Sequence, residues 1–307
     1  MKAPWVSPYN APAIEQSIHD YIVSIFRQLT GPERKVEIVP ISPGAEATRG
    51  WDAAVMEVVP LFLQYKYPDF TSRPWSSQPS AFKYRQGWAF DDSDGVFHFH
   101  LRAKAEKAPK SQHELMFDLQ STGKRVFYVA PTFIDVKRLR SGGDPLYDRP
   151  WINSRLSFRR GYLIDFISVP YFDGLICIPP HVNVTGAPEN HVFYFNAKHE
   201  VSLHSDPAIV ESRDFGVVIA DQIDDVLSPR AITRNNVELY VQEILEMLSG
   251  EKNQGSEIIK EYFSANLGQT EAARRNPLMQ NMRALAKLMR KLYGIEVLLT
   301  CRREPQR

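Results

Sequence analysis

The segment that most constrains how this chain can fold is WDAAVMEVVPLFLQYKY, residues 51–67. It is rich in β-branched and aromatic residues, which favour buried strands. Side chains alternate along a strand, so Gln64 and Lys66 are predicted to share one face, with Leu63 and Tyr65 on the other. A lysine within an apolar strand is costly to bury without a partner. The segment therefore predicts a polar site on the face of Gln64 and Lys66.

Pro60 divides this segment in the middle. Proline has no N–H to donate to a neighbouring strand, so we expect two strands, residues 51–59 and 61–67, joined by a tight connection at Pro60. In such an antiparallel pair, Asp52 at the start of the first strand lies beside Lys66 near the end of the second. The sequence thus predicts that a carboxylate and an ammonium group meet on adjacent strands.

The first 131 residues are predicted to contain helices and strands in the order helix, three strands, helix, strand. These elements are expected at residues 12–29, 35–41, 51–59, 61–67, 109–120 and 125–131. A further strand is expected at residues 97–103. In the second half, strands are expected at 162–169, 191–197 and 200–204, followed by helices from about residue 233. The last helix, residues 278–293, has an apolar stripe and precedes a strand, GIEVLLT.

The composition limits which classes of protein are possible, but it does not identify a function. The chain has 37 Lys and Arg against 36 Asp and Glu, and this net charge of +1 argues neither for nor against nucleic acid as a partner. Its two cysteines exclude a disulfide framework and a cysteine-rich zinc site. No apolar run approaches the roughly 20 residues that span a bilayer, and the N-terminus lacks the apolar core of a signal peptide. We expect a cytoplasmic protein with no membrane partner.

The stretch GWDAAVMEVVPLFLQYK, residues 50–66, resembles the active-site hairpin of the PD-(D/E)XK superfamily of restriction-endonuclease-like nucleases. Gln64-Tyr65-Lys66 is similar to the QXK form of the Mrr-like enzymes. The order of elements over residues 10–135 resembles that superfamily's αβββαβ core. The resemblance implies an α/β fold with a central mixed sheet: a nuclease-like core in residues 1–145, with accessory strands and a helical C-terminal region in residues 146–307. Whether these are one domain or two is left open.

The resemblance also implies a chemistry, the metal-dependent hydrolysis of phosphodiester bonds with Mg²⁺ or Mn²⁺ as cofactor. Asp52 would be the anionic metal ligand, and Gln64 and the backbone carbonyl of Tyr65 would add neutral oxygen ligands. Lys66 would orient the attacking water and stabilise charge in the transition state.

Glutamine carries no charge where the commoner family member has glutamate, so a second carboxylate is expected. Glu15 in the first helix is the first choice, because that helix supplies an acidic group in many relatives, and Glu46 is the rival. Gln112 and His113, at the start of the helix after the strands, are expected to face the same cleft and contact phosphate or a metal-bound water. For each of these four residues, an exposed side chain without a role is the alternative.

Nucleic acid is the expected partner, with DNA the first choice and RNA left open, and a protein partner or a second copy of the chain is also left open. Basic residues interleaved with aromatic ones indicate a track for phosphates and bases. They lie in residues 83–88, 137–140, 149–162 and 274–294. The resemblance associates the chain with bacterial restriction or phage defence. Two alternatives remain: an inactive nuclease-like module that binds nucleic acid or a protein, and a scaffold protein in which the motif is a coincidence.

Overall fold

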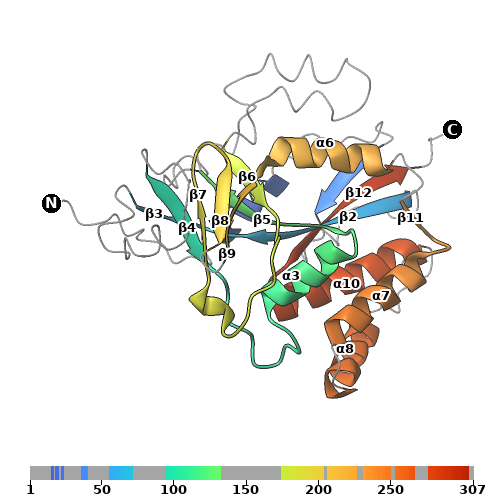
Figure 1. Ribbon diagram of the computed structural model, residues 1–307. Coiled ribbons are helices and arrows are strands. Elements are labelled where there is room, and N and C mark those ends of the chain that lie inside the picture. Colours follow the sequence, from blue (N-terminus) through green and yellow to red (C-terminus); the bar gives the residue numbers. More distant parts are fainter. Residues whose placement is uncertain are drawn as a thin grey trace, which may run out of the picture.

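The computed structural model describes residues 15–16, 18–20, 22–23, 36–40, 55–71, 95–132, 174–203, 206–226, 231–249, 253–266 and 276–303. Over these residues the protein has a mixed α/β structure with two separate sheets, as Figure 1 shows. The predicted α/β class with a central mixed sheet is confirmed. The strand expected at 162–169 and the basic segments 83–88, 137–140 and 149–162 lie outside the described residues.

The larger sheet contains seven described strands and lies at the centre of the molecule. Its strands in spatial order are β1 (Val36–Pro40), β12 (Glu296–Arg303), β2 (Val55–Tyr65), β5 (Arg125–Pro131), β6 (Leu175–Ile178) and β10 (Arg213–Asp214), with β11 (Ile232–Thr233) also paired to β2. Only β2 and β5 run parallel to each other, and the other described pairs in this sheet are antiparallel.

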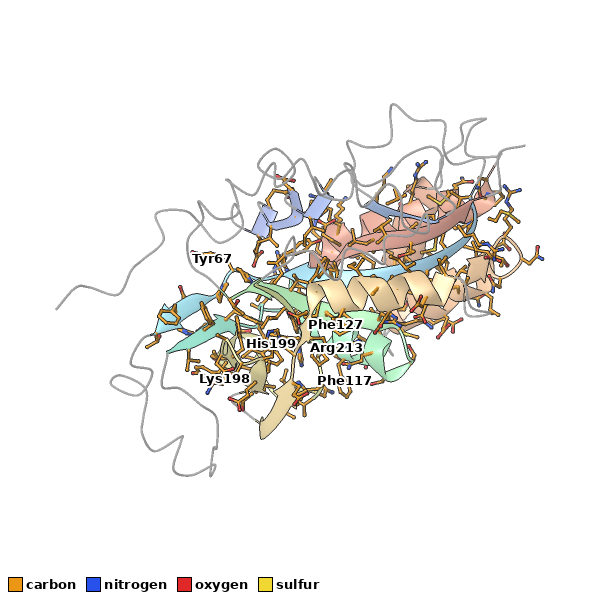
Figure 2. The ribbon with its side chains drawn as sticks, turned by 90° about the horizontal axis from the view of Figure 1, so that it is seen from above. Tyr67, Phe117, Phe127, Lys198, His199 and Arg213 are labelled. Atoms are coloured by element: carbon orange, nitrogen blue, oxygen red, sulfur yellow. The ribbon has the colours of Figure 1, made fainter. Side chains whose placement is uncertain are left out.

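Helices cover both faces of this sheet. Helix α6 (Phe215–Val226) lies on one face, and its apolar residues share a core with the helical residues Ile18 and Ile22. Figure 2 looks down on α6, with Phe127 of β5 and Arg213 of β10 beside it. The helices on the opposite face are α3 (Gln112–Ser121), α7 (Val237–Ser249), α8 (Asn253–Asn266) and α10 (Pro277–Tyr293) (Figure 1). The sheet thus separates two apolar cores.

The smaller sheet is antiparallel and adjoins the core on the α3 side. Its strands in order are β3 (Asp69–Thr71), β4 (Val96–His100), β7 (Val192–Phe195), β8 (Glu200–Leu203) and β9 (Asp206–Glu211). Aromatic rings pair across β4 and β7, with centroids 5.4 Å apart for Phe97 and Phe195 and 5.3 Å apart for Phe99 and Phe193. The strands predicted at 97–103, 191–197 and 200–204 are therefore present, but in a second sheet.

The hairpin predicted at Pro60 is wrong. Strand β2 continues through Pro60 as one eleven-residue strand, so Val55 and Lys66 lie about 36 Å apart at the usual rise per residue. Strand β12 pairs with β2 in an unbroken register from Leu63 to Glu57, with Pro60 opposite Leu299. The backbone hydrogen bonds between β2 and β12 before and after Pro60 stabilise the strand by more than the one missing N–H donor of the proline costs. The reason for placing Asp52 beside Lys66 is therefore lost, and Asp52 and Glu46 lie outside the described residues.

The antiparallel neighbour of β2 comes from the C-terminus. Strand β12, which includes the predicted strand GIEVLLT, lies between β1 and β2. Its residues alternate between the two cores, with Leu298 in one and Leu299 in the other. Residues on both sides of the predicted boundary at 145 therefore form a single sheet.

Capping residues mark the ends of two of the predicted helices, α3 and α10. Ser111 and Glu114 form a capping box at the start of α3, and Asn276 caps α10. Helix α10 ends at Gly294, whose left-handed conformation (φ 65°) is one that glycine adopts without strain. The predicted apolar stripe of α10 is buried in the core. None of the described helices is both long enough and apolar enough to span a membrane.

Candidate functional site

Gln64 and Lys66 lie at the C-terminal end of β2, where this strand runs beside its parallel neighbour β5. Gln64 bonds to α3, and the Lys66 ammonium approaches rings of the core on that same side. Leu63 and Tyr65 pack into the core on the other side of the sheet. The predicted alternation of these side chains is confirmed.

The ammonium group of Lys66 lies over two aromatic rings. The side chain is only 6% exposed, and its Nζ lies 5.7 Å from the ring centroid of Phe99 and 5.8 Å from that of Tyr128. No oxygen of a described residue hydrogen-bonds to it. Burial lowers the pKa of Lys66 to about 8, the carboxylate of Glu15 opposes this shift, and the guanidinium of Arg102 adds to it. Lys66 therefore changes charge close to neutral pH.

Glu15 is the predicted second carboxylate that the structure brings to Lys66. It lies on the helix before β1, and its side chain is partly buried. Burial raises the pKa of the Glu15 carboxyl, while the positive charges of Lys66 and Arg102 lower it. A carboxylate, an ammonium and a guanidinium group from three separate segments thus interact electrostatically at the end of β2.

Sequence reasoning missed Arg102, although it lies near the end of the strand predicted at residues 97–103. A Cβ added at Gly294 would lie 2.7 Å from the Nη1 atom of Arg102 and 3.6 Å from the amide groups of Gln64 and Gln112. Arg102 therefore lies close to the Gln64 and Gln112 amides. The absence of a side chain at Gly294 leaves the space that the guanidinium occupies.

Gln112 links α3 to the end of β2. It is 4% exposed, so the alternative of a solvent-exposed helix residue is wrong. Its Nε2 atom donates to Oε1 of Gln64 and to the backbone carbonyl of Tyr293, while its own Oε1 is buried without a hydrogen-bond partner. Gln112 thus orients the Gln64 amide and leaves one buried acceptor unused.

His113 has a structural role. Its Nε2 atom lies 2.7 Å from the carbonyl of Val182, an acceptor, so Nε2 carries the proton. Its Nδ1 atom then accepts from the Tyr128 hydroxyl, 2.8 Å away. Burial lowers the pKa of His113 to about 4, so the ring is neutral at pH 7. Both ring nitrogens are occupied, which leaves neither for the phosphate contact that we expected.

Replacing Tyr128 with Phe should lower the free energy of unfolding by about 1–2 kcal/mol, because the buried Nδ1 atom of His113 loses its donor. Urea denaturation measures this change. The matched control is Tyr194→Phe in the smaller sheet, a residue whose hydroxyl does not bond to His113. An unchanged unfolding free energy in Tyr128→Phe would contradict the assigned hydrogen bond.

The described residues do not by themselves fit a divalent cation. Gln64 Oε1 accepts from Gln112, and the carbonyl of Tyr65 accepts from Gln64 Nε2 at 2.8 Å, so both expected neutral ligands are engaged. Among the described residues, Glu15 is the carboxylate that acts on Lys66, and the two positive groups Lys66 and Arg102 accompany it. Nowhere in the described part of the chain do three His, Cys, Asp or Glu side chains gather as metal ligands. This charge balance suits an anion better than a cation.

Comparison with models of protein families, with curated proteins and with solved structures found no match for this chain. The resemblance to the restriction-endonuclease-like superfamily therefore stays a prediction from the residues that carry it.

Proposed function

We propose that this chain binds the phosphodiester backbone of nucleic acid, DNA or RNA, at the cluster of Glu15, Gln64, Lys66 and Arg102, and hydrolyses it. The observation that carries the proposal is the buried ammonium of Lys66, which has no hydrogen-bond acceptor among the described residues. A buried ammonium group without an acceptor is costly unless a ligand supplies one. A phosphate oxygen is an acceptor of the right charge.

Phosphate binding follows from the charges of the cluster. Among the described residues, the cluster holds two positive groups, Lys66 and Arg102, and one carboxylate, Glu15, on which both of them act. Arg102 is exposed and offers a planar set of donors, the geometry with which arginine binds phosphate oxygens. Lys66 sits deeper and would contact the same phosphate as a point charge.

Hydrolysis would use Glu15 as the base. The oxygen of a water molecule bonds to phosphorus, the water's proton passes to the Glu15 carboxylate, and the bond from phosphorus to the leaving sugar oxygen breaks. The ammonium of Lys66 stabilises the charge that develops on the phosphoryl oxygens and donates a proton to the leaving oxygen. Burial, which raises the pKa of Glu15, makes this carboxylate a stronger base.

A dependence on Mg²⁺ or Mn²⁺ is a separate part of the proposal. It comes from the resemblance, and the described residues supply too few carboxylates for it. Asp52 and Glu46, which lie outside the described residues, are the acids that we predicted for this purpose. A role in restriction or phage defence likewise follows from the resemblance alone.

Binding without cleavage is the second candidate. It is favoured by the hydrogen bonds that already engage Gln64 and the Tyr65 carbonyl. In an inactive nuclease-like site, the positive groups would still bind phosphate, while the former metal ligands would form hydrogen bonds within the protein.

The test measures binding by fluorescence polarisation and cleavage on gels, using single- and double-stranded DNA and RNA with Mg²⁺, Mn²⁺ or a chelator. Glu15→Gln should reduce cleavage by about a hundredfold or more and leave binding within a few fold, because a base is lost and the cations remain. The matched control is Glu257→Gln on the exposed side of α8. Binding with no cleavage in the unaltered protein supports the second candidate, and failure to bind any of the substrates contradicts both.

Binding should weaken as the pH rises through about 8. Below that pH the Lys66 ammonium is charged, and above it the amine is neutral and attracts phosphate less. A titration of oligonucleotide affinity from pH 6 to 9.5 measures the effect. In Lys66→Arg the guanidinium stays charged across this range, so the same transition should vanish. An identical pH profile in both proteins would contradict the assignment of the transition to Lys66.

A further inference from the structure

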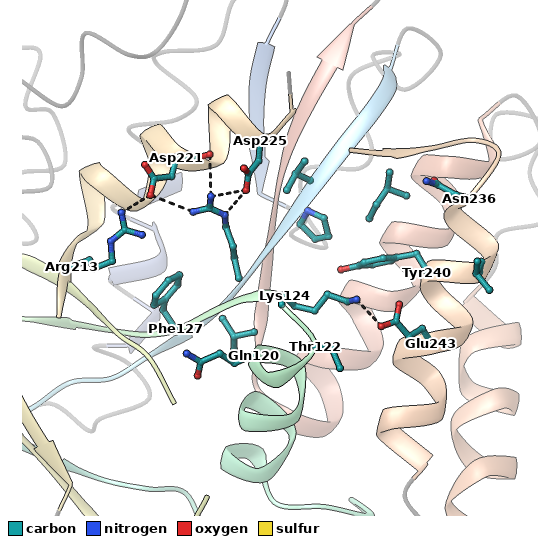
Figure 3. A pocket seen from close by; sticks show the side chains of 17 residues that line it. Gln120, Thr122, Lys124, Phe127, Arg213, Asp221, Asp225, Asn236, Tyr240 and Glu243 are labelled. Carbon is teal, nitrogen blue, oxygen red and sulfur yellow. Dashed lines mark hydrogen bonds and ion pairs between the residues drawn. The ribbon is translucent and has the colours of Figure 1, made fainter. Parts of the chain in front are cut away.

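Arginine side chains fix the position of helix α6 on the larger sheet. Asp221 and Asp225 of α6 pair with Arg125 at 3.6 and 2.6 Å, and Asp221 also pairs with Arg213. Figure 3 shows these side chains in the wall of a cavity. The two arginines begin strands β5 and β10, so the ion pairs set where α6 lies on the sheet. Apolar packing alone is non-directional and would let a helix slide or turn.

The helix that carries Glu15 packs into the same core as α6. Its residues Ile18 and Ile22 are fully buried there. A directional contact joins this helix to α10, because the Nη2 atom of Arg290 donates to the Oε1 atom of Gln16 at 3.3 Å. Gln16 follows Glu15 directly in the sequence, so a contact that fixes Gln16 also fixes the backbone from which the Glu15 carboxylate extends.

Arg290 is itself held by the strand that pairs with β2. Its Nε atom pairs with Oε1 of Glu296 at 2.9 Å, and Glu296 begins β12, opposite Leu63 in the register of β2 and β12. The Glu296 side chain is only 11% exposed. Burial raises the pKa of its carboxyl group, and the guanidinium of Arg290 opposes this shift. One arginine therefore bonds both to the first helix and to the neighbour of the strand that leads to Lys66.

The same end of α10 contacts other segments of the cluster. The backbone carbonyl of Tyr293 accepts a hydrogen bond from Gln112. The next residue, Gly294, leaves the space that Arg102 occupies, and its N–H donates to the carbonyl of Arg290 at 2.9 Å. The last turn of α10 thus fixes several parts of the cluster relative to one another.

We infer that Arg290 is a positioning residue, which keeps the Glu15 carboxylate near the Lys66 ammonium. It acts through Gln16 and touches neither the phosphate nor the attacking water. Its part in hydrolysis rests on the proposed function. The position of Glu15 can be tested without any substrate.

Gln16→Met tests the inference, because it removes the acceptor for Arg290 and leaves the ion pair with Glu296 in place. Gln16 is exposed, so the fold should tolerate the change. The readout is the pKa of Lys66 in the free protein, followed by NMR of ¹⁵N-labelled lysine. The carboxylate of Glu15 raises this pKa, so its displacement should lower the pKa from about 8.

Cleavage is the second readout. In Gln16→Met the turnover rate should fall by about threefold to tenfold, the range for the loss of one hydrogen bond, while oligonucleotide affinity stays within about twofold. Arg290→Lys has one nitrogen in place of the two that bond separately to Glu296 and Gln16. The double variant should be no slower than the slower single variant, since both changes remove the same contact.

Gln242→Met on α7 is the matched control. Like Gln16, Gln242 is exposed and donates to a carboxylate four residues further along its helix. The change should leave the pKa of Lys66 and the cleavage rate as in the wild type. The inference is overturned if Gln16→Met leaves the pKa of Lys66 unchanged, or if that pKa falls while cleavage stays at the wild-type rate. A fall in the pKa together with no cleavage by the wild type supports the positioning of Glu15 and contradicts the proposed hydrolysis.

Discussion

Replacing Lys66 with Met should reduce nucleic-acid cleavage by about a hundredfold to a thousandfold and weaken binding, while the protein stays as stable as before or becomes more stable. The first effect follows because the ammonium group is the buried positive charge of the cluster. The second follows because burying that charge without an acceptor among the described residues costs free energy, and methionine of similar length avoids this cost, while Arg102 remains as a positive group acting on the Glu15 carboxylate. Cleavage assays and urea denaturation measure the two effects.

The matched control is Lys104→Met, which removes an exposed ammonium group outside the cluster. It should change cleavage little. If Lys66→Met unfolded at markedly lower urea concentration, the lysine would have to be a stabilising structural residue. The proposal would then lose its physical basis.

Replacing Leu299 with Ala should lower the free energy of unfolding by about 2–5 kcal/mol, because Leu299 is fully buried in the core and lies opposite Pro60 in the register of β2 and β12. Such a loss is a large share of the stability of an ordinary domain. Urea denaturation followed by circular dichroism measures it.

Leu239→Ala on α7 is the matched control, since Leu239 is 72% exposed. The change should cost less than about 0.5 kcal/mol. Equal effects of the two substitutions would contradict the placement of β12 between β1 and β2. The comparison therefore tests whether the C-terminal strand completes the central sheet.

The sequence predicts those helices and strands that follow from the spacing of apolar residues within a short segment. The apolar alternation placed Gln64 and Lys66 together, and the spacing of apolar residues predicted the helix that carries Glu15. These patterns come from strand and helix periodicity, which neighbouring residues determine. The pairing of Glu15 with Lys66 was predicted from the resemblance rather than from the pattern.

The partner of β2 could not be predicted from local sequence. Pro60 is a local signal for a break, and it favoured a hairpin within residues 51–67. The strand that pairs with β2 instead begins at Glu296, more than two hundred residues along the chain. Nothing in either strand alone encodes that register, because any two apolar strands can pair.

Arg102 was missed for a similar reason. It follows a strand of the second sheet, and only the packing of that sheet against α3 and α10 brings it near Gly294. Basic residues after a strand are usually solvated. The one residue that makes room for Arg102 is Gly294. From the sequence alone this glycine is already accounted for as the residue that ends a helix, so it gave no reason to look for a neighbouring arginine.

The most direct measurement of the central claim is the NMR signal of the Lys66 Nζ atom in ¹⁵N-lysine-labelled protein, assigned with Lys66→Met. It is followed during titration with a phosphorothioate oligonucleotide that resists hydrolysis. A phosphate group beside the ammonium should shift this signal and raise the pKa of Lys66 above about 8, since a negative neighbour favours the charged form. A saturated complex in which the Lys66 signal and pKa are unchanged would contradict the account.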